Sequence, residues 1–430
     1  MVFNDKVAEK MFEKMNDSDE GIRLAAAAGL KTLYQNGSLP MPQSNGNVNN
    51  HIHTQYSFSP YSPAKAAYMA WVNGLDTAGI MDHDSIAGAE EFIKAGEIFG
   101  IATTIGFECR VDFSKTQFNG KRLNNPDQAS IAYVAMHGIP HQNIARAQEF
   151  LTPYREKRNL RNRKMVENIN GILSPFGISI DFDTDVLPIS NAQKGGSVTE
   201  RHILFAVANK LLERFGKGEQ LIAFLQNDMG IHISERNLTW LSDMDNPYYD
   251  YDLLGVLKSD MVEKFYIPAK EECPDVSEFI ALAKEIGAIP AYAYLGDVGS
   301  SVTGDKKAQK FEDDFLPELV EALAKMEFCA ITYMPTRNTL EQLQFLSGLC
   351  EKYSLFQISG EDINSPRQKF KNDLILTDNF KHLVTATWAL IGHEKAATKN
   401  IAEGMFTPET VAKYPDLNQR IAVYEKIGRE

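Results

Sequence analysis

Short apolar runs alternate with amphipathic stretches along much of the chain. Seven runs have the length and the flanking turn residues of β-strands. The predicted strands are 47–53, 75–83, 101–108, 130–137, 288–295, 328–335 and 355–362. Apolar residues spaced at i, i+3 and i+4 predict intervening helices over 63–73, 84–99, 312–326 and 337–352. This alternation predicts right-handed βαβ units and a parallel sheet, with enough units to close a barrel.

The long interval between His137 and Ala288 breaks the alternation and is mostly helical in pattern. Residues 5–36 also have helical spacing, with a break near Asn16–Gly21, and so does the tail from Asp378 onward. These patterns predict a barrel with three helical additions. The predicted parts are an N-terminal helical extension (1–46), the barrel (47–142 and 276–378), a helical insertion acting as a lid (143–275) and a C-terminal helical segment (379–430).

Composition and charge exclude several classes of protein. The 430 residues are 43% hydrophobic and carry a formal net charge of −13, which argues against a long nucleic acid as partner. A small phosphorylated substrate needs only a few local cations and stays open. The four cysteines form no CxxC pair, and no segment has the apolar length of a membrane span. The N-terminus lacks a signal-peptide core, so we expect a cytoplasmic protein without a membrane partner.

Residues that can ligate metals end five of the seven predicted strands. The reactive groups of a parallel barrel lie at the C-terminal ends of its strands, so these residues are expected to meet. His51 and His53 are two apart on one strand, so both imidazoles face the same side. Histidine with carboxylate suits Zn²⁺, Mn²⁺ or Fe²⁺ better than Ca²⁺. The other strand ends carry Asp82 with His83, Glu108, His137, and Glu361 with Asp362.

Each of these residues also has a structural interpretation. A single histidine such as His137 often serves only as a hydrogen-bonded core residue. Asp84 can cap the helix that follows it, and the His51–His53 spacing can arise by accident. The metal hypothesis depends on recurrence at the same end of successive strands. The remaining histidines lack such placement and are interpreted as surface or core residues; they are His141, His232, His382 and His393.

These motifs, in this order, resemble the PHP (polymerase and histidinol phosphatase) domain of metal-dependent phosphoesterases. The matching elements are the HxHT start, the DH pair, the GxE, the single histidine after an apolar strand and the terminal GxD. The resemblance covers roughly residues 47–142 and 280–365, and the inserted helices resemble those of the branch that acts on nucleotide or oligonucleotide phosphates. It implies an α/β fold, a distorted (βα)7 TIM-like barrel with up to three metal ions.

The resemblance also assigns ligand positions. It places His51, His53, Glu108 and Asp362 at a first metal, Glu108 and His137 at a second, and His83 at a third; Asp82 stands beside His83 as a further candidate. Other family ligand positions are altered, because Phe58 or Ser59, Tyr294 and Asn364 stand where ligands are expected. We therefore expect one firmly bound ion, Mn, Zn or Fe, and leave open a second, weaker one.

Cationic and polar residues near the expected site are candidates for substrate binding. Arg337 and Arg367 follow the sixth and seventh strands, where guanidinium groups suit bidentate phosphate contact. The alternative for each is an exposed arginine at a helix start. By resemblance, Arg201 and His202 contact substrate from the insertion; alternatively they begin a helix capped by Thr199. Tyr294 is placed to donate to a phosphate oxygen, and Asn364 completes the set.

The sequence thus predicts a metal-dependent hydrolase, a phosphoesterase for a small phosphorylated metabolite or nucleotide. Catalysis would use a metal-activated water held by His51, His53, Glu108 and Asp362. The altered ligands favour an alternative, a decayed or repurposed barrel that binds metal and a metabolite without hydrolysis. A hydrolase acting on C–O or C–N bonds would use the same ligands. The N-terminal helices leave a homo-oligomer open.

Overall fold

The computed structural model describes residues 5–299 and 309–430. Its N-terminal helices are α1 (Lys6–Lys14) and α2 (Glu20–Gln35), and each is capped by an aspartate. The Asp5 side chain accepts from Val7 N, and the Asp19 side chain accepts from Ile22 N. Both contacts satisfy amide groups that a helix leaves unpaired at its start. The predicted break between two N-terminal helices is confirmed.

Seven strands form one sheet in the order of the sequence. An isolated parallel bridge between Ile52 and Ile363 brings the first strand beside the segment that follows the last, so the sheet is nearly closed into a barrel. The predicted α/β barrel is confirmed. Its strands are β1 (Val48–Ile52), β2 (Thr77–His83), β3 (Ala102–Asp112), β4 (Ile131–His137), β5 (Ile289–Ala293), β6 (Ala330–Tyr333) and β7 (Phe356–Ser359).

The direction of β4 differs from the all-parallel prediction. This strand is antiparallel to both β3 and β5, whereas the other neighbouring strands are parallel. Residues 113–130, which join β3 to β4, contain no helix that could carry the chain back across the barrel. A parallel connection needs such a crossover, whereas an antiparallel one does not. The C-terminal end of β4 therefore points toward the opposite end of the barrel from the ends of β1, β2 and β3.

Helices surround the strands and enclose the barrel core. Phenylalanines such as Phe92, Phe107 and Phe279 are completely buried between strands and helices. The sequence starts α3 with Pro63 at its first turn, after Ser62, whose side chain accepts from Lys65 N. The helices of this layer are α3 (Pro63–Val72), α4 (Ala89–Phe99), α10 (Val276–Ile286), α11 (Leu316–Lys325) and α12 (Leu340–Tyr353).

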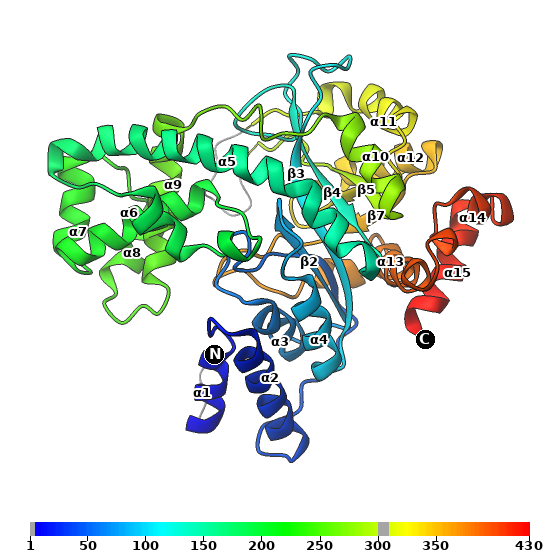
Figure 1. Cartoon of the computed structure of the whole chain (residues 1–430), viewed down its shortest axis with the longest axis horizontal. Coiled ribbons are helices and arrows are strands. Elements are labelled where there is room, and N and C mark those ends of the chain that lie inside the picture. The colour runs from blue at the N-terminus through cyan, green and yellow to red at the C-terminus, as the bar shows by residue number, and fades with distance from the viewer. Residues whose placement is uncertain (1–4, 300–308) are drawn as a thin grey trace.

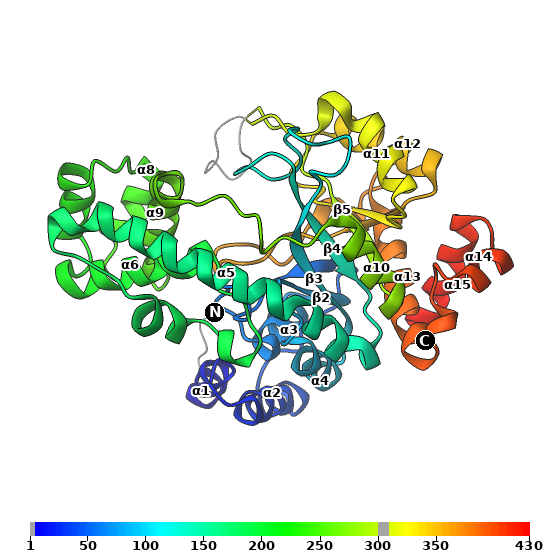
Figure 2. The same ribbon diagram turned by 45° about the horizontal axis from the view of Figure 1, so that its top comes forward.

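Residues 144–265, here called the helical segment, extend to one side of the barrel (Figure 1). Its long first helix, α5, runs from the barrel into a bundle that has a hydrophobic core of its own. Figure 2 shows the same separation of bundle and barrel after rotation. The helices are α5 (Ile144–Leu173), α6 (Glu200–Phe215), α7 (Glu219–Ala223), α8 (Glu235–Ser242) and α9 (Tyr249–Phe265).

The C-terminal helices lie on the opposite side of the barrel from the helical segment (Figures 1 and 2). They are α13 (Lys381–Lys399), α14 (Pro408–Lys413) and α15 (Leu417–Arg429). Helix α13 covers part of the barrel core, where Ala389 and Leu390 pack against strand residues. Among the helices of the described residues, none combines the length and the apolar character needed to cross a membrane.

Candidate metal centre

The end of β1 directs two imidazoles to one place. His51 and His53 share a face because they are two residues apart in extended chain. Backbone bonds hold this end against the segment after β7: His53 N donates to Ile363 O at 2.9 Å, and Ile363 N donates to His51 O at 3.1 Å. The close approach requires Gly360, where an added Cβ would lie 2.5 Å from His51 Cβ.

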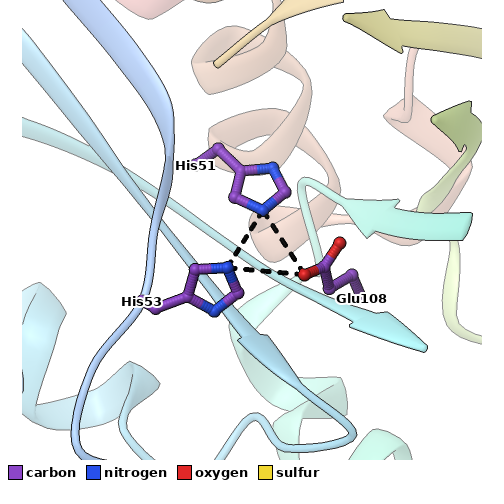
Figure 3. Close-up of side chains that lie close together, drawn as sticks. All are labelled: His51, His53 and Glu108. Atoms are coloured by element: carbon purple, nitrogen blue, oxygen red, sulfur yellow. Dashed lines mark hydrogen bonds and ion pairs between the residues drawn. The ribbon is translucent and has the colours of Figure 1, made fainter. Parts of the chain in front are cut away.

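Glu108 on β3 completes the group with its side chain directed toward both imidazoles (Figure 3). Its Oε1 lies 3.5 Å from His51 Nε2 and 3.4 Å from His53 Nε2, and the two Nε2 atoms are 3.2 Å apart. His53 is almost completely buried, whereas His51 and Glu108 retain slight exposure. The strands therefore bring together three side chains that the sequence analysis assigned to one ion.

Asp362 reaches the same group from the segment after β7. Its Oδ1 lies 3.2 Å from His53 Nε2, and the Asn364 side chain donates to this oxygen at 2.6 Å. The Asp362 carboxylate is more exposed, with 39% of its side chain accessible. The four predicted ligands of the first ion thus converge at the rim of the barrel, with the aspartate on the open side.

The spacing of the three buried atoms fits a divalent ion. Ligands about 2.0–2.1 Å from one tetrahedral ion lie about 3.3–3.4 Å from each other. The measured separations of 3.2, 3.4 and 3.5 Å among His51, His53 and Glu108 are close to this value. Within the described chain, these three residues form the group of histidines and carboxylates whose ligand atoms lie close enough together to hold one ion. Two imidazoles and a carboxylate suit Zn²⁺, Mn²⁺ or Fe²⁺.

The electrostatics keep the carboxylates ionised. Burial raises the pKa of Glu108, but His83 and His51 outweigh burial and hold it well below its usual range. Burial likewise raises the pKa of Asp362, and the adjacent His53 and His51 outweigh this effect and lower the pKa. Burial lowers the pKa of His53 and favours its neutral ring. For His51 the lowering by burial is exceeded by the Glu108 carboxylate, so its pKa is raised.

The carboxylate of Asp82, a predicted metal ligand, is bound by the loop that follows β1. Its carboxylate accepts from Thr54 N, from Thr54 Oγ1 and from Ser57 Oγ, each at 2.6 Å. Ser57 Oγ in turn lies 3.1 Å from His53 Nδ1. The threonine of the HxHT motif therefore anchors the loop after β1 to Asp82, and the aspartate supports the ligand His53 through a hydroxyl group.

His83 and His137 adjoin the group in different ways. His83 Nδ1 lies 2.9 Å from Glu108 Oε1, an ion-pair distance when the imidazole is protonated. His137 ends β4, and the reversal of that strand pairs it with Gly106, two residues before Glu108. Burial, with a further contribution from the charge of His51, lowers the pKa of His137 to about 3. Its buried Nε2 has no hydrogen-bond partner among the described residues.

The insertion residues Arg201 and His202 lie at the start of α6. Arg201 Nη1 is 3.5 Å from Asn364 O, so the helical segment reaches the segment that carries Asp362. His202 is buried and its Nδ1 accepts from Thr199 N at 2.9 Å, as the alternative of an N-terminal cap predicted. Burial lowers the pKa of His202 to about 3.

Three predicted substrate residues have other partners in the structure. The Tyr294 hydroxyl donates to Asp313 Oδ1 at 2.7 Å, and its ring is buried in a hydrophobic cluster. Arg337 Nε donates to Leu295 O at 3.0 Å. Arg367 pairs with Asp252 at 2.6 and 2.7 Å and lies over the Trp240 ring. These contacts hold loops together, and the sequence could not reveal them because the partners are distant in the chain.

A buried group of charges that was not predicted from the sequence joins the helical segment to the barrel. Glu200 accepts from Arg158 Nη2 at 3.0 Å and from Arg161 Nη2 at 2.6 Å. Arg158 also pairs with Asp84, next to His83, and Arg110 Nη1 on β3 lies 3.7 Å from Glu200 Oε1. Charges on helices usually face solvent, so no local pattern distinguished these arginines.

Comparison with known proteins gives a family match. The model of the PHP domain matches residues 49–329, which is more than half of the chain. The structure is similar to that of a proposed metal-dependent phosphoesterase from Bifidobacterium adolescentis, with 18% identity, a TM-score of 0.51, and coverage of 79% of this chain and 96% of that one. An amidohydrolase from Chromobacterium violaceum with bound sulfate and no metal has 15% identity, a TM-score of 0.48, and coverage of 75% and 88%. No curated protein matched the chain.

Proposed function

The chain belongs to the PHP domain family, its ligand group is that of a metal-dependent hydrolase, and we propose that it cleaves phosphoesters. The observation that carries the proposal is the convergence of His51, His53 and Glu108, with Asp362 beside them at the open rim. The substrate is a small phosphorylated metabolite or a nucleotide. A net charge of −13 disfavours a long nucleic acid.

His51, His53, Glu108 and Asp362 would hold the divalent ion. When bound, the ion lowers the pKa of a coordinated water toward neutrality and draws charge from a phosphate oxygen. The chain's own residues do the rest. Asp82 and Ser57 orient His53 so that its Nε2 faces the other ligands. The low pKa of Glu108 keeps this carboxylate ionised at neutral pH.

Arg201 is the residue best placed to bind the substrate phosphate. Its guanidinium group is half-buried and lies 3.5 Å from Asn364 O, two residues from Asp362. A guanidinium group can donate two parallel hydrogen bonds to phosphate oxygens. Because Arg201 belongs to the helical segment and Asp362 to the barrel, the substrate phosphate binds where these two parts meet.

A metal-binding barrel without hydrolytic activity is the second candidate. The observations in its favour are the Tyr294 hydroxyl bonded to Asp313 and the Asn364 amide bonded to Asp362, at positions where the resemblance implies ligands. An enzyme with fewer ligands would hold fewer ions. The two candidates share the first metal site and differ in turnover.

Metal content and phosphatase activity distinguish the two candidates. Purified protein loaded with Mn²⁺, Zn²⁺ or Fe²⁺ would be assayed with an aryl phosphate and then with a panel of phosphorylated metabolites. The proposal expects one or more equivalents of metal and a turnover that His53→Ala abolishes. The control His232→Ala changes an exposed histidine of the helical segment and should retain both. Bound metal without turnover of any substrate would favour the second candidate.

A further inference from the structure

One hydroxyl group determines which nitrogen of His53 carries the proton. Ser57 Oγ donates to Asp82 Oδ1 at 2.6 Å, because an ionised carboxylate can only accept. The hydroxyl group has a single proton, so its contact with His53 Nδ1 at 3.1 Å requires Nδ1–H as the donor. His53 Nε2 then carries the lone pair, and Nε2 is the atom nearest His51, Glu108 and Asp362.

The helical segment fastens the loop that carries Ser57. Ser197 N donates to Tyr56 O at 2.7 Å, and Asn191 Nδ2 donates to Gln55 O at 3.2 Å. Both carbonyl groups immediately precede Ser57 in the chain. The main-chain carbonyl groups of the loop are therefore held by residues that lie between α5 and α6.

Phe58, directly after Ser57, is held by aromatic residues of α6 and α9. Its ring meets His202 edge-on, with ring centres 4.9 Å apart, and it also contacts Phe205 at 5.4 Å and Tyr251 at 5.8 Å. The φ angle of Phe58 is +92°, a conformation that residues with a side chain rarely adopt. Such a conformation persists only while the surroundings impose it. Loss of the aromatic contacts would let the backbone relax and displace Ser57.

We propose that Phe58 and Ser57 couple docking of the helical segment to the metal-ligating state of His53. The proposal concerns regulation of the metal site described under the proposed function and rests on that site. Docking of α6 and α9 holds Phe58, Phe58 positions Ser57, and Ser57 keeps the proton on His53 Nδ1. Coupling of two equilibria is reciprocal, so a bound ion also stabilises the docked segment.

Zn²⁺ titration of the full chain tests the coupling from both sides of the contact. Ser57→Ala removes the hydroxyl group and should raise the Kd for Zn²⁺ about tenfold or more, as loss of a ligand's hydrogen-bond partner typically does. Phe58→Leu and Phe205→Leu should each raise it several-fold. The matched control is Phe215→Leu, on the same helix as Phe205 but stacked on Phe224, where the Kd should be that of the parent.

A second measurement reports on His53 without any metal. In protein labelled with ¹⁵N-histidine, the parent should show the Nδ1–H form of His53, identified by its absence in His53→Gln. Ser57→Ala and Phe58→Leu should show a mixture of the two neutral forms of His53. Phe215→Leu, which only destabilises the helical segment, should not show this mixture. Hydrogen exchange of α6 and α9 should slow when Zn²⁺ is added to the parent.

Two results would overturn the coupling: Kd values for Phe58→Leu and Phe205→Leu equal to that of Phe215→Leu, or an unchanged Nδ1–H form in Phe58→Leu. Neither measurement uses a substrate. If the Kd values of the variants for Zn²⁺ differ as expected but no substrate is hydrolysed, the phosphoesterase function is contradicted and the coupling stands. Hydrolysis by Phe58→Leu with parental Zn²⁺ affinity would contradict the coupling alone.

Discussion

His53 Nε2 lies 3.2 Å from Asp362 Oδ1, although the two residues belong to opposite ends of the barrel sequence. Closure of the sheet produces this contact, because Ile52 bridges to Ile363 and aligns the end of β1 with the segment after β7. The residues that would hold the ion therefore come from both of the segments that close the sheet, β1 and the segment after β7. An ion bound here would stabilise the contact between these two segments in addition to its role in catalysis.

Metal loading should stabilise the folded chain, and Glu108→Gln should remove most of this effect. A ligand that binds only the folded state adds about 2.7 kcal/mol at a concentration of 100 times its Kd. The amide of glutamine lacks the negative charge and one of the acceptor oxygens that the ion needs. Thermal unfolding with and without Zn²⁺, with chelator as reference, measures the difference in Tm.

The control for this experiment is His232→Ala, which should gain stability from Zn²⁺ as the parent does. An equal Zn²⁺-induced gain in Glu108→Gln and in the parent would place the ion elsewhere. The contact between His83 and Glu108 would then be only structural.

Asp82→Asn should weaken the binding of the metal ion but leave the number of ions bound per chain unchanged. The native carboxylate accepts three hydrogen bonds from Thr54 and Ser57, and an amide nitrogen in its place would face a donor. We expect a loss of about 1–3 kcal/mol in the free energy of unfolding and about a tenfold higher Kd for Zn²⁺. Urea denaturation and Zn²⁺ titration measure the two effects.

Asp76→Asn is a matched control, because Asp76 immediately precedes the same strand at its other end and accepts from Ser44. It should leave the Kd unchanged. If Asp82→Asn lost a full equivalent of metal while keeping the stability of the parent, Asp82 would be a ligand after all.

The sequence contained enough information to predict the strands and the meeting of their ends. Apolar runs bounded by turn residues located all seven strands. The spacing of His51 and His53 placed both imidazoles on one face. Glu108 joined them because β3 runs parallel to β2, which runs parallel to β1. The ends of the strands lie close together in a barrel. The position of a residue near the end of a strand therefore indicated which side chains would meet.

Strand direction and side-chain partners could not be predicted in the same way. Periodicity is identical for parallel and antiparallel strands, so the reversal of β4 left no mark on its apolar pattern. Asp82 and Tyr294 are polar groups whose roles depend on Ser57, Thr54 and Asp313, which approach only in three dimensions. Local sequence indicates that a polar group needs a partner but does not identify the partner.

Arg201→Ala should lower kcat/KM for a phosphorylated substrate about 10- to 100-fold, because hydrogen bonds to a charged group contribute about 1.5–3 kcal/mol. Metal content should stay at the level of the parent, since Arg201 forms no hydrogen bond or ion pair with His51, His53 or Glu108 within the described chain. Arg201→Lys should recover part of the loss, because it keeps the charge but not the planar pair of donors. Steady-state kinetics and metal analysis of the three proteins measure these effects.

Arg367 is the matched comparison for Arg201, because it is an arginine that the structure pairs with Asp252 and not with the metal group. Arg367→Ala would leave the buried Asp252 carboxylate with Asn246 but without its charged partner, so its main effect should be on stability. If it lowered kcat/KM as strongly as Arg201→Ala at unchanged stability, the assignment of the phosphate contact to Arg201 would be wrong.

The stability of the chain should rise with pH between about pH 4 and 6.5, and His393 should contribute to the slope. Burial lowers the pKa of His393 to about 4, and its Nδ1 accepts from Met405 N at 2.9 Å. The unfolded chain, with a pKa of about 6.5, therefore binds more protons in this range, which makes folding less favourable as the pH falls. The full difference corresponds to about 3 kcal/mol.

His393→Asn keeps an acceptor for Met405 N but cannot bind the proton, so urea denaturation at pH 4.5 and 6.5 should show a shallower slope of stability against pH than in the parent. The exposed His232, replaced in the same way, should leave the slope unchanged, and equal slopes for His393→Asn and the parent would contradict the assignment.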